Sequence, residues 1–242
     1  MTDPEWATPP SKSAGDVLHG IVKAALSLKA GPAGDLFAFV IRSPYERRME
    51  TWMERCEMRF RHLAERDAQI IAMLPDRDEF ISVFIAATQA AVRTHHDTKL
   101  RMLTSAVAQS AAGTDVETDV QLMFVRFVDE LTPSHFAFLT LLADHEETAA
   151  KMDTYEDLRL LFLSISGSRV TPAEFKLMCN DLHARVLARF SDAIEDFDGI
   201  AVVDAIATED SGRGPKVVVT DLGQSFLRFV AEGSGEQGFN DR

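Results

Sequence analysis

The sequence is short of positive charge. Its 242 residues include 25 lysines and arginines against 38 aspartates and glutamates, a formal net charge of −13 at pH 7. The deficit is larger in residues 120–242, which hold 11 basic and 21 acidic residues, than in residues 1–119, which hold 14 and 17. A nucleic-acid-binding protein needs the opposite balance on its contacting face, so the composition disfavours a broad phosphate-binding surface. An acidic surplus favours solubility and basic partners.

Cysteine is scarce as well. Cys56 and Cys179 are far apart, and neither has a Cys or His at metal-ligand spacing. Both lie in amphipathic helical patterns, where a buried thiol behaves as a small hydrophobe. This usage excludes a disulfide framework and fits a reducing compartment, so we expect a cytoplasmic protein.

Long uncharged apolar runs are missing. The nearest candidate, residues 17–41, is interrupted by Lys23, Lys29, Asp35 and a Gly/Pro turn at residues 31–34. It therefore predicts a core hairpin rather than a membrane span. No basic segment followed by an apolar stretch and a small-residue cleavage site is present, so we expect no secretory signal and no membrane partner.

Helical periodicity dominates what is present. Apolar residues recur at three- and four-residue steps over residues 44–74, 80–91, 100–110, 116–130, 133–142 and 154–165. We predict that the first helix begins at Ser43-Pro44, which offers a hydroxyl cap and a proline in the first turn. Its polar face mixes arginines with equally many acids, which indicates a solvated face with ion pairs. Such helices must cover one another's apolar stripes, and this predicts a bundle.

Residues 171–230 have a different pattern. Thr171-Pro-Ala-Glu174 is a capping box with proline at the first helical position, and it predicts a helix over 172–190. An apolar strand (200–206), a polar Gly-rich tip (209–214), a second strand (216–219) and a helix after Thr220 follow. This order predicts a winged-helix-like segment.

The predicted fold class is therefore mainly α, with an N-terminal helical bundle followed by a winged-helix-like α+β segment containing one β-hairpin. We expect a disordered leader in the proline-containing residues 1–15 and the bundle in residues 16–130. The winged-helix-like domain is expected in residues 131–231, and a flexible tail in residues 232–242.

The segment around the predicted second strand carries two short motifs, Gly212-Arg213-Gly214 and Val219-Thr220-Asp221-Leu222-Gly223. With them, residues 200–230 resemble the wing and following helix of winged-helix regulators of the antibiotic-resistance regulator type. The resemblance implies that the helix before the wing, here 172–190, would lie in the major groove of DNA. The acidity of this region disfavours that use.

A second resemblance covers residues 34–140. It is carried by Gly34-Asp35-Leu36, by Ser43-Pro44 with Arg47, Arg48 and Trp52, by Arg93-Thr94 with Lys99 and Leu103, and by Leu131-Thr132-Pro133 with His135. This part is similar to a group of uncharacterised bacterial helical proteins, some of which carry an abortive-infection (phage-defence) label. The resemblance implies a defence or signalling setting and no particular chemistry.

Catalytic motifs are lacking. The sequence has no Gly-rich phosphate loop, nucleophile elbow or Cys/His arrangement, so we expect no enzyme activity, no cofactor and no metal. The most polar cluster in a helical region is His95-His96-Asp97, flanked by Arg93 and Lys99. A metal or proton-transfer site, a small-anion or peptide contact and a solvated helix break are all compatible with it. His135, in a first helical turn, is expected to be half-exposed.

These patterns lead to an expected interaction surface. Its candidate residues are Arg213, Arg185, Arg189 and Lys216 around the predicted wing, and Arg93, His95, His96 and Lys99 in the bundle. We expect a non-enzymatic protein-interaction or regulatory module that binds a protein partner or another copy of itself. The alternative is a DNA-binding regulator that uses residues 172–190 and inserts Arg213 into a minor groove.

Overall fold

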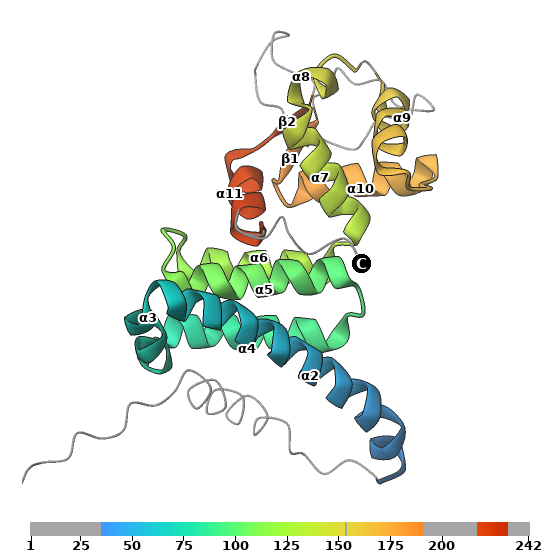
Figure 1. Cartoon of the computed structure of the whole chain (residues 1–242). Coiled ribbons are helices and arrows are strands. Elements are labelled where there is room, and N and C mark those ends of the chain that lie inside the picture. Colours follow the sequence, from blue (N-terminus) through green and yellow to red (C-terminus); the bar gives the residue numbers. More distant parts are fainter. Residues whose placement is uncertain (1–34, 153, 191–216, 232–242) are drawn as a thin grey trace, which may run out of the picture. The chain divides into compact units, whose positions relative to one another are not determined.

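A computed structural model describes residues 35–152, 154–190 and 217–231, and helices make up 80% of these residues (Figure 1). The chain divides into two units between Asp129 and Glu130. Several predicted segments lie outside the described residues: the leader 1–15, most of 17–41, the strand 200–206, the tip 209–214 and the tail 232–242. Among the helices described, none has the length and apolar character needed to cross a bilayer.

The first unit is built from helices. They are α2 (Asp35–Arg66), α3 (Ala68–Met73), a 3-10 turn η1 (Leu74–Asp76), α4 (Asp78–Arg93), α5 (Asp97–Ala112) and α6 (Thr118–Glu130). Helix α2 packs against α4 and α5, and α4 packs along α5 (Figure 1). Each of these helices therefore buries its apolar stripe against two neighbours, as the periodicity of the sequence requires.

Aromatic side chains join α2 to α4. The Phe60 ring lies edge-on to Phe80, with centroids 5.9 Å apart, and Phe84 lies 6.4 Å from Phe60. Trp52 is fully buried about two turns before Phe60, and its indole N–H donates to Thr88 Oγ1 over 3.0 Å. Large aromatic rings bury much apolar area, so these contacts dominate the packing between the two helices.

The longest helix differs from the prediction at both ends. It begins at Asp35, so Pro44 lies inside α2 and does not start it. A proline inside a helix removes one backbone hydrogen bond, but the residues before it continue the helical turn here. The helix ends before Asp67, because this carboxylate accepts hydrogen bonds from the backbone N–H groups of Gln69 and Ile70 and so starts α3.

The second unit combines helices with one small sheet. Its elements are α7 (Pro133–Asp144), α8 (Glu146–Ala149), α9 (Tyr155–Ser166), α10 (Pro172–Ala184), β1 (Ala188–Phe190), β2 (Val217–Val219) and α11 (Asp221–Val230). The two strands are antiparallel, with Arg189 opposite Val218. Helix α10 packs against α7, α9 and β1, while α7 also contacts β2 and α11.

Phe138 of α7 is the centre of this unit's core. Its ring centroid lies 5.5 Å from Phe162 of α9, 4.8 Å from Phe175 of α10 and 6.3 Å from Phe190 of β1. All four rings are buried. One side chain thus contacts three other elements, and the apolar stripes of α9 and α10 both face it.

Helix α10 is shorter than predicted. It ends at Ala184, and residues 188–190 form β1, so the prediction of a helix over 172–190 is wrong at its C-terminal end. Two hydrogen bonds close the helix, from Val186 N–H to His183 O and from Leu187 N–H to Leu182 O. This pair of bonds is a Schellman motif, in which the residue after the cap adopts a left-handed conformation. Here that residue is Val186, with φ of 57°.

A valine in this position is strained, because its branched Cβ crowds the backbone at positive φ. Among the described non-glycine residues, Val186 alone has a positive φ. We expect Val186→Gly to raise the free energy of unfolding by about 0.5–1 kcal/mol, since relief of about 1–2 kcal/mol of strain exceeds the entropic cost of glycine. Urea denaturation of the variant measures this change. Val186→Ala keeps a Cβ, so its free energy of unfolding should rise less. A glycine variant less stable than the wild type would show that Val186 is not strained.

The start of α11 is tied to the end of α10. Thr220 Oγ1 accepts the Gly223 N–H over 3.0 Å and so caps α11, while its hydroxyl donates to Val186 O. The Thr220 backbone N–H donates to Leu187 O over 3.1 Å. The Thr-x-x-Gly spacing therefore has a local physical role. Thr220 caps α11 and also joins it to the residues that follow α10.

Candidate functional site

Helix α10 begins as the sequence predicts. Thr171 Oγ1 accepts the Glu174 N–H, and the Glu174 carboxylate accepts the Thr171 N–H over 2.8 Å. The Glu174 carboxylate accepts hydrogen bonds first from the Thr171 backbone and second from the Thr171 hydroxyl, and both lower its pKa. The predicted capping box is confirmed, and it fixes where α10 begins.

The solvent-facing side of α10 includes an uncharged stripe, which exposed Glu174 and half-exposed Lys176 and Asp181 flank. The stripe consists of Ala173, Leu177, Asn180 and Ala184, which follow one another at helical spacing and are all exposed. We call these four residues the α10 outer face. The Leu177 side chain is 59% exposed, unusual for a large apolar residue. The opposite side, with Phe175, Met178, Cys179 and Leu182, is buried.

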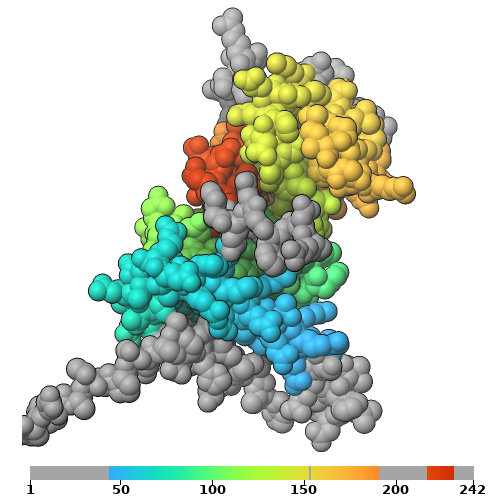
Figure 2. Space-filling model, in the orientation of Figure 1, coloured from blue at the N-terminus to red at the C-terminus, as the bar shows by residue number. Residues whose placement is uncertain are grey.

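The neighbouring helix α9 also exposes large apolar side chains. Leu160 and Ile165 are each 51% exposed, and Leu161 and Leu163 are partly exposed. Helix α9 packs directly against α10, and Figure 2 shows its residues, in yellow-orange, at the surface of the unit. We call Leu160, Ile165 and the α10 outer face together the α9–α10 surface. An apolar surface of this kind is typical of an interaction site.

Arg185, a predicted interaction residue, is held by the protein itself. Its guanidinium donates to Asp181 Oδ1 over 3.2 Å and to Glu130 Oε2 over 3.3 Å. Arg189 is exposed on β1, while Arg213 and Lys216 lie outside the described residues. Of the four basic residues predicted around the wing, the structure thus places one in an ion-pair network and one at the surface.

His135 is buried, contrary to the expectation of a half-exposed side chain. Its Nδ1 accepts the Thr132 N–H over 3.2 Å, and its Nε2 lies 3.2 Å from Asp181 Oδ2. The acceptor role of Nδ1 implies that the proton is on Nε2, which donates to Asp181. The imidazole therefore joins the start of α7 to α10. Its position three residues after the Thr132 cap was the available sequence signal.

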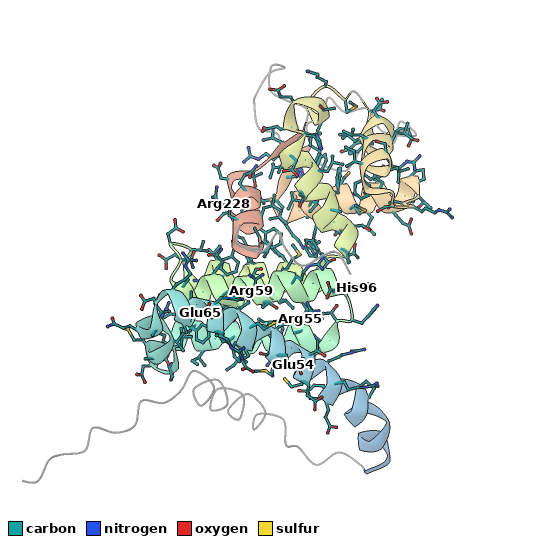
Figure 3. The ribbon with its side chains drawn as sticks, in the orientation of Figure 1. Glu54, Arg55, Arg59, Glu65, His96 and Arg228 are labelled. Atoms are coloured by element: carbon teal, nitrogen blue, oxygen red, sulfur yellow. The ribbon has the colours of Figure 1, made fainter. Side chains whose placement is uncertain are left out.

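Arg93 is the last residue of α4, His95 and His96 lie in the α4–α5 loop, and Lys99 lies in the first turn of α5. The two imidazole rings are exposed and lie 4.1 Å apart, and His96 precedes α5 (Figure 3). Arg93 forms an ion pair with Asp129. Lys99 is only 8% exposed, and its Nζ donates to Asp129 O over 2.7 Å. Burial lowers the pKa of Lys99, partly offset by Asp129.

Asp97 connects the start of α5 to α2. Its carboxylate accepts hydrogen bonds from Arg55 of α2 (Figure 3) and from Arg101 one turn further along α5. The bond from Arg55 is the main reason that the pKa of Asp97 is lowered. A negative charge in the first turn of a helix is also favoured by the helix dipole. The carboxylate of the predicted His-His-Asp cluster is therefore an ion-pair partner of two arginines.

Several cations of the first unit bind helix C-termini. Arg48 donates to Val92 O near the end of α4, and Arg77 donates to Ala111 O over 2.9 Å at the end of α5. Lys99 does the same for α6 through Asp129 O. The last carbonyls of a helix have no partner within it and carry partial negative charge, so a cation there stabilises the fold. The charges of these three side chains are therefore used within the fold to stabilise helix C-termini.

The described residues give little support for a nucleophilic thiol or a metal site. Cys56 and Cys179 are free and buried, as expected, and burial raises the pKa of both thiols well above the usual value. Buried protonated thiols are poor nucleophiles. Within the described ranges, no group of three or more His, Cys, Asp or Glu side chains is placed to hold a metal ion. The strongest candidate site is accordingly the uncharged α9–α10 surface.

Comparison of the chain with family models, with curated proteins and with solved structures found no match.

Proposed function

We propose that the second unit is a winged-helix-like protein-interaction module and that the chain is a non-enzymatic regulatory protein. The element order α7, α9, α10, β1, β2, α11 and the antiparallel pairing of β1 with β2 support the winged-helix arrangement. In this arrangement α10 corresponds to the recognition helix. The observation that carries the proposal is the uncharged, apolar α10 outer face, with Leu177 largely exposed.

A recognition helix that enters a DNA groove needs cations or hydrogen-bonding side chains pointing outward, because phosphates and base edges are its ligands. The centre of the outward side here is formed by two alanines, a leucine and one asparagine, and the exposed charged residue beside them, Glu174, is acidic. Arg185, at the end of this helix, is bound to Asp181 and Glu130. Removing exposed leucine from water by contact with another protein is favourable, whereas placing it against phosphates is not.

The setting we propose is bacterial defence or signalling in the cytoplasm. Its support is the resemblance carried by Ser43-Pro44 and Leu131-Thr132-Pro133, together with two free, buried cysteines. The second candidate function is a DNA-binding regulator. It is favoured by one observation, the exposed Arg189 on β1, at the base of the predicted wing that contains Arg213 and Lys216.

Titration of a labelled random duplex separates the two functions. We expect no binding at about 0.05 M salt, because phosphate neutralisation by several cations would otherwise give affinity that falls steeply with salt. Fluorescence anisotropy of the full chain at rising salt concentration measures this. Binding with a log–log slope of about −3 or steeper would support the regulator and contradict our proposal.

A charge-addition variant serves as the positive control. Ala173→Arg with Leu177→Arg places two cations on the α10 outer face. Weak, salt-sensitive duplex binding is expected in this variant, with the slope changing by about −1 for each phosphate contact. Arg189→Ala should leave the wild-type titration unchanged. If the wild-type chain does bind the duplex, a loss of that binding on this substitution would identify Arg189 as a DNA contact.

A further inference from the structure

Helix α2 carries arginines along one side. A helix turns by about 100° per residue, so residues four, seven or eleven positions apart lie on nearly the same side. The arginines of α2 with these separations fall within about 40° of one another: Arg48, Arg55, Arg59 and Arg66. We call these four residues the α2 basic stripe. At about 1.5 Å per residue, the stripe is about 27 Å long.

The acidic residues of α2 lie away from this stripe. Among residues 44–66, no aspartate or glutamate falls within about 60° of the centre of the stripe. Most of the glutamates lie on the opposite side of the helix, where Glu57 pairs with Arg61 over 2.8 Å. In Figure 3, Arg59 lies on the side of α2 toward α5, and Glu54 lies on the other side. The expected ion pairing is therefore present, but the two signs of charge are separated over most of the helix.

Helix α5 borders the stripe and adds to its charge. The carboxylate of Asp97 accepts hydrogen bonds from Arg55 and from Arg101 of α5, so these two positive charges and one negative charge keep a net charge of +1. Arg48 donates to Val92 O, a carbonyl that accepts the bond without neutralising the guanidinium. Each arginine of the stripe is exposed or half-exposed. The surface along α2 and the start of α5 is therefore positive in a chain whose net charge is −13.

Helix stability does not account for this arrangement. Arg55 and Arg59 lie four residues apart, and like charges at that spacing destabilise a helix. A glutamate at either position would instead form a stabilising ion pair with the other residue. A stripe of one sign thus lowers the stability of the helix by itself, and opposite charge supplied from outside the helix removes that repulsion.

The shape of the stripe indicates a narrow acidic partner. The stripe is bordered by Glu65, which lies 3.4 Å from His62, and by Asp67, the cap of α3. A nucleic-acid duplex presents phosphates over a broad surface, so it would meet these acids as well as the arginines, and the net charge of −13 would repel it. A partner helix laid along α2 can contact the arginines without reaching the glutamates on the opposite side. Carboxylates at helical spacing on its near side would meet the arginines in turn, as charged residues beside a coiled-coil seam do.

We propose that the α2 basic stripe binds an acidic helix of a protein partner. An arginine guanidinium donates two parallel hydrogen bonds to one carboxylate, so carboxylates spaced along the partner helix pair with Arg48, Arg59 and Arg66. Salt weakens this complex, because ion pairs at the surface are screened. The stripe belongs to the first unit and shares no residue with the α9–α10 surface, so the inference goes beyond the proposed function.

Fluorescence anisotropy of a labelled, helix-forming peptide of alanine and glutamate, with glutamate at every third or fourth position, tests the stripe. We expect the full chain to bind this peptide with a dissociation constant below about 0.1 mM at about 0.05 M NaCl, rising at least about tenfold at about 0.3 M NaCl. Arg59→Glu combined with Arg66→Glu should raise the dissociation constant by about thirtyfold or more, because two attractions become repulsions. Should urea denaturation show that this variant is not folded, Arg59→Gln combined with Arg66→Gln should still raise it by about tenfold.

The same helix offers a matched control. Arg47 and Arg61 lie outside the stripe, and Arg61 is paired with Glu57. Arg47→Glu combined with Arg61→Glu changes the net charge by the same amount and should change the dissociation constant by less than about threefold. An equal loss of binding in this control would show that net charge, and not the stripe, sets the affinity, and would overturn the inference.

Three other results would overturn it. One is a dissociation constant for the peptide above about 0.1 mM at about 0.05 M NaCl. Another is equally tight binding of a peptide in which glutamine replaces every glutamate, because charge would then not be recognised. The third is binding of a labelled random duplex that Arg59→Glu combined with Arg66→Glu abolishes, because the stripe would then be a nucleic-acid contact.

Discussion

Replacement of Gly223 by alanine is expected to lower the free energy of unfolding by about 2–4 kcal/mol. A Cβ at this position would lie 2.1 Å from Leu187 O and 2.9 Å from Val219 Cγ1. Leu187 O belongs to the backbone and already accepts the Thr220 N–H, so it cannot move aside as the end of a flexible side chain could. The substitution should therefore separate α11 from the end of α10.

The sign of this effect is diagnostic. Glycine-to-alanine in a helix usually raises stability by about 0.5–1 kcal/mol, because alanine loses less backbone entropy on folding. Urea unfolding followed by circular dichroism measures the change. Ser225→Ala, two residues later in the same helix, is the control and should be neutral or slightly stabilising. An alanine variant at position 223 as stable as the wild type would show that α11 does not approach Leu187 as closely as described.

The second large effect is expected at Trp52. Its side chain is fully buried between α2 and α4, so Trp52→Ala should cost about 3–5 kcal/mol through lost burial and the cavity left behind. The indole N–H donates to Thr88 Oγ1, whose hydroxyl in turn donates to Phe84 O over 2.8 Å. The tryptophan therefore supplies packing and a donor, while the Thr88 hydroxyl accepts from it and donates to the α4 backbone.

A double-mutant cycle separates these two contributions. Thr88→Val leaves the buried indole N–H without its partner, and we expect a loss of about 1–3 kcal/mol. Trp52→Phe keeps an aromatic ring but removes that N–H. With both substitutions the loss should be smaller than the sum of the two single losses, because no unpaired donor remains. Strict additivity in urea denaturation would mean that the hydrogen bond contributes nothing to the packing of α2 on α4.

Local patterns account for much of what could be predicted. The helical step of buried residues such as Phe80, Phe84 and Ala87 predicted α4, and the Thr171–Glu174 capping box predicted the start of α10. Both signals involve residues within four positions of each other, so the chain needs no distant contact to express them. The mainly helical character was predictable for the same reason, but the observed strand β1 lies in a segment predicted as helix and pairs with the distant β2.

The sequence did not predict which partner each charged side chain binds. Lys99 and Arg185 were expected at an interaction surface, but Lys99 is buried against the end of α6, and Arg185 bridges Asp181 and Glu130. The partner of Lys99 is 30 residues away and Glu130 is 55 residues from Arg185. A cation in a sequence shows only that a charge is present, whereas its partner depends on which helices pack together.

Alone, the sequence determined the acidic balance, the two isolated thiols, the helix-forming periods and the caps of α7, α9 and α10. The tertiary structure decided that residues 188–190 pair as β1 with β2, that His135 is buried, and that Arg185 is held by Asp181 and Glu130. The division has one physical cause. Periodicity and capping are interactions within one or two helical turns, but solvent exposure and charge pairing are set by elements that meet only when the chain has folded.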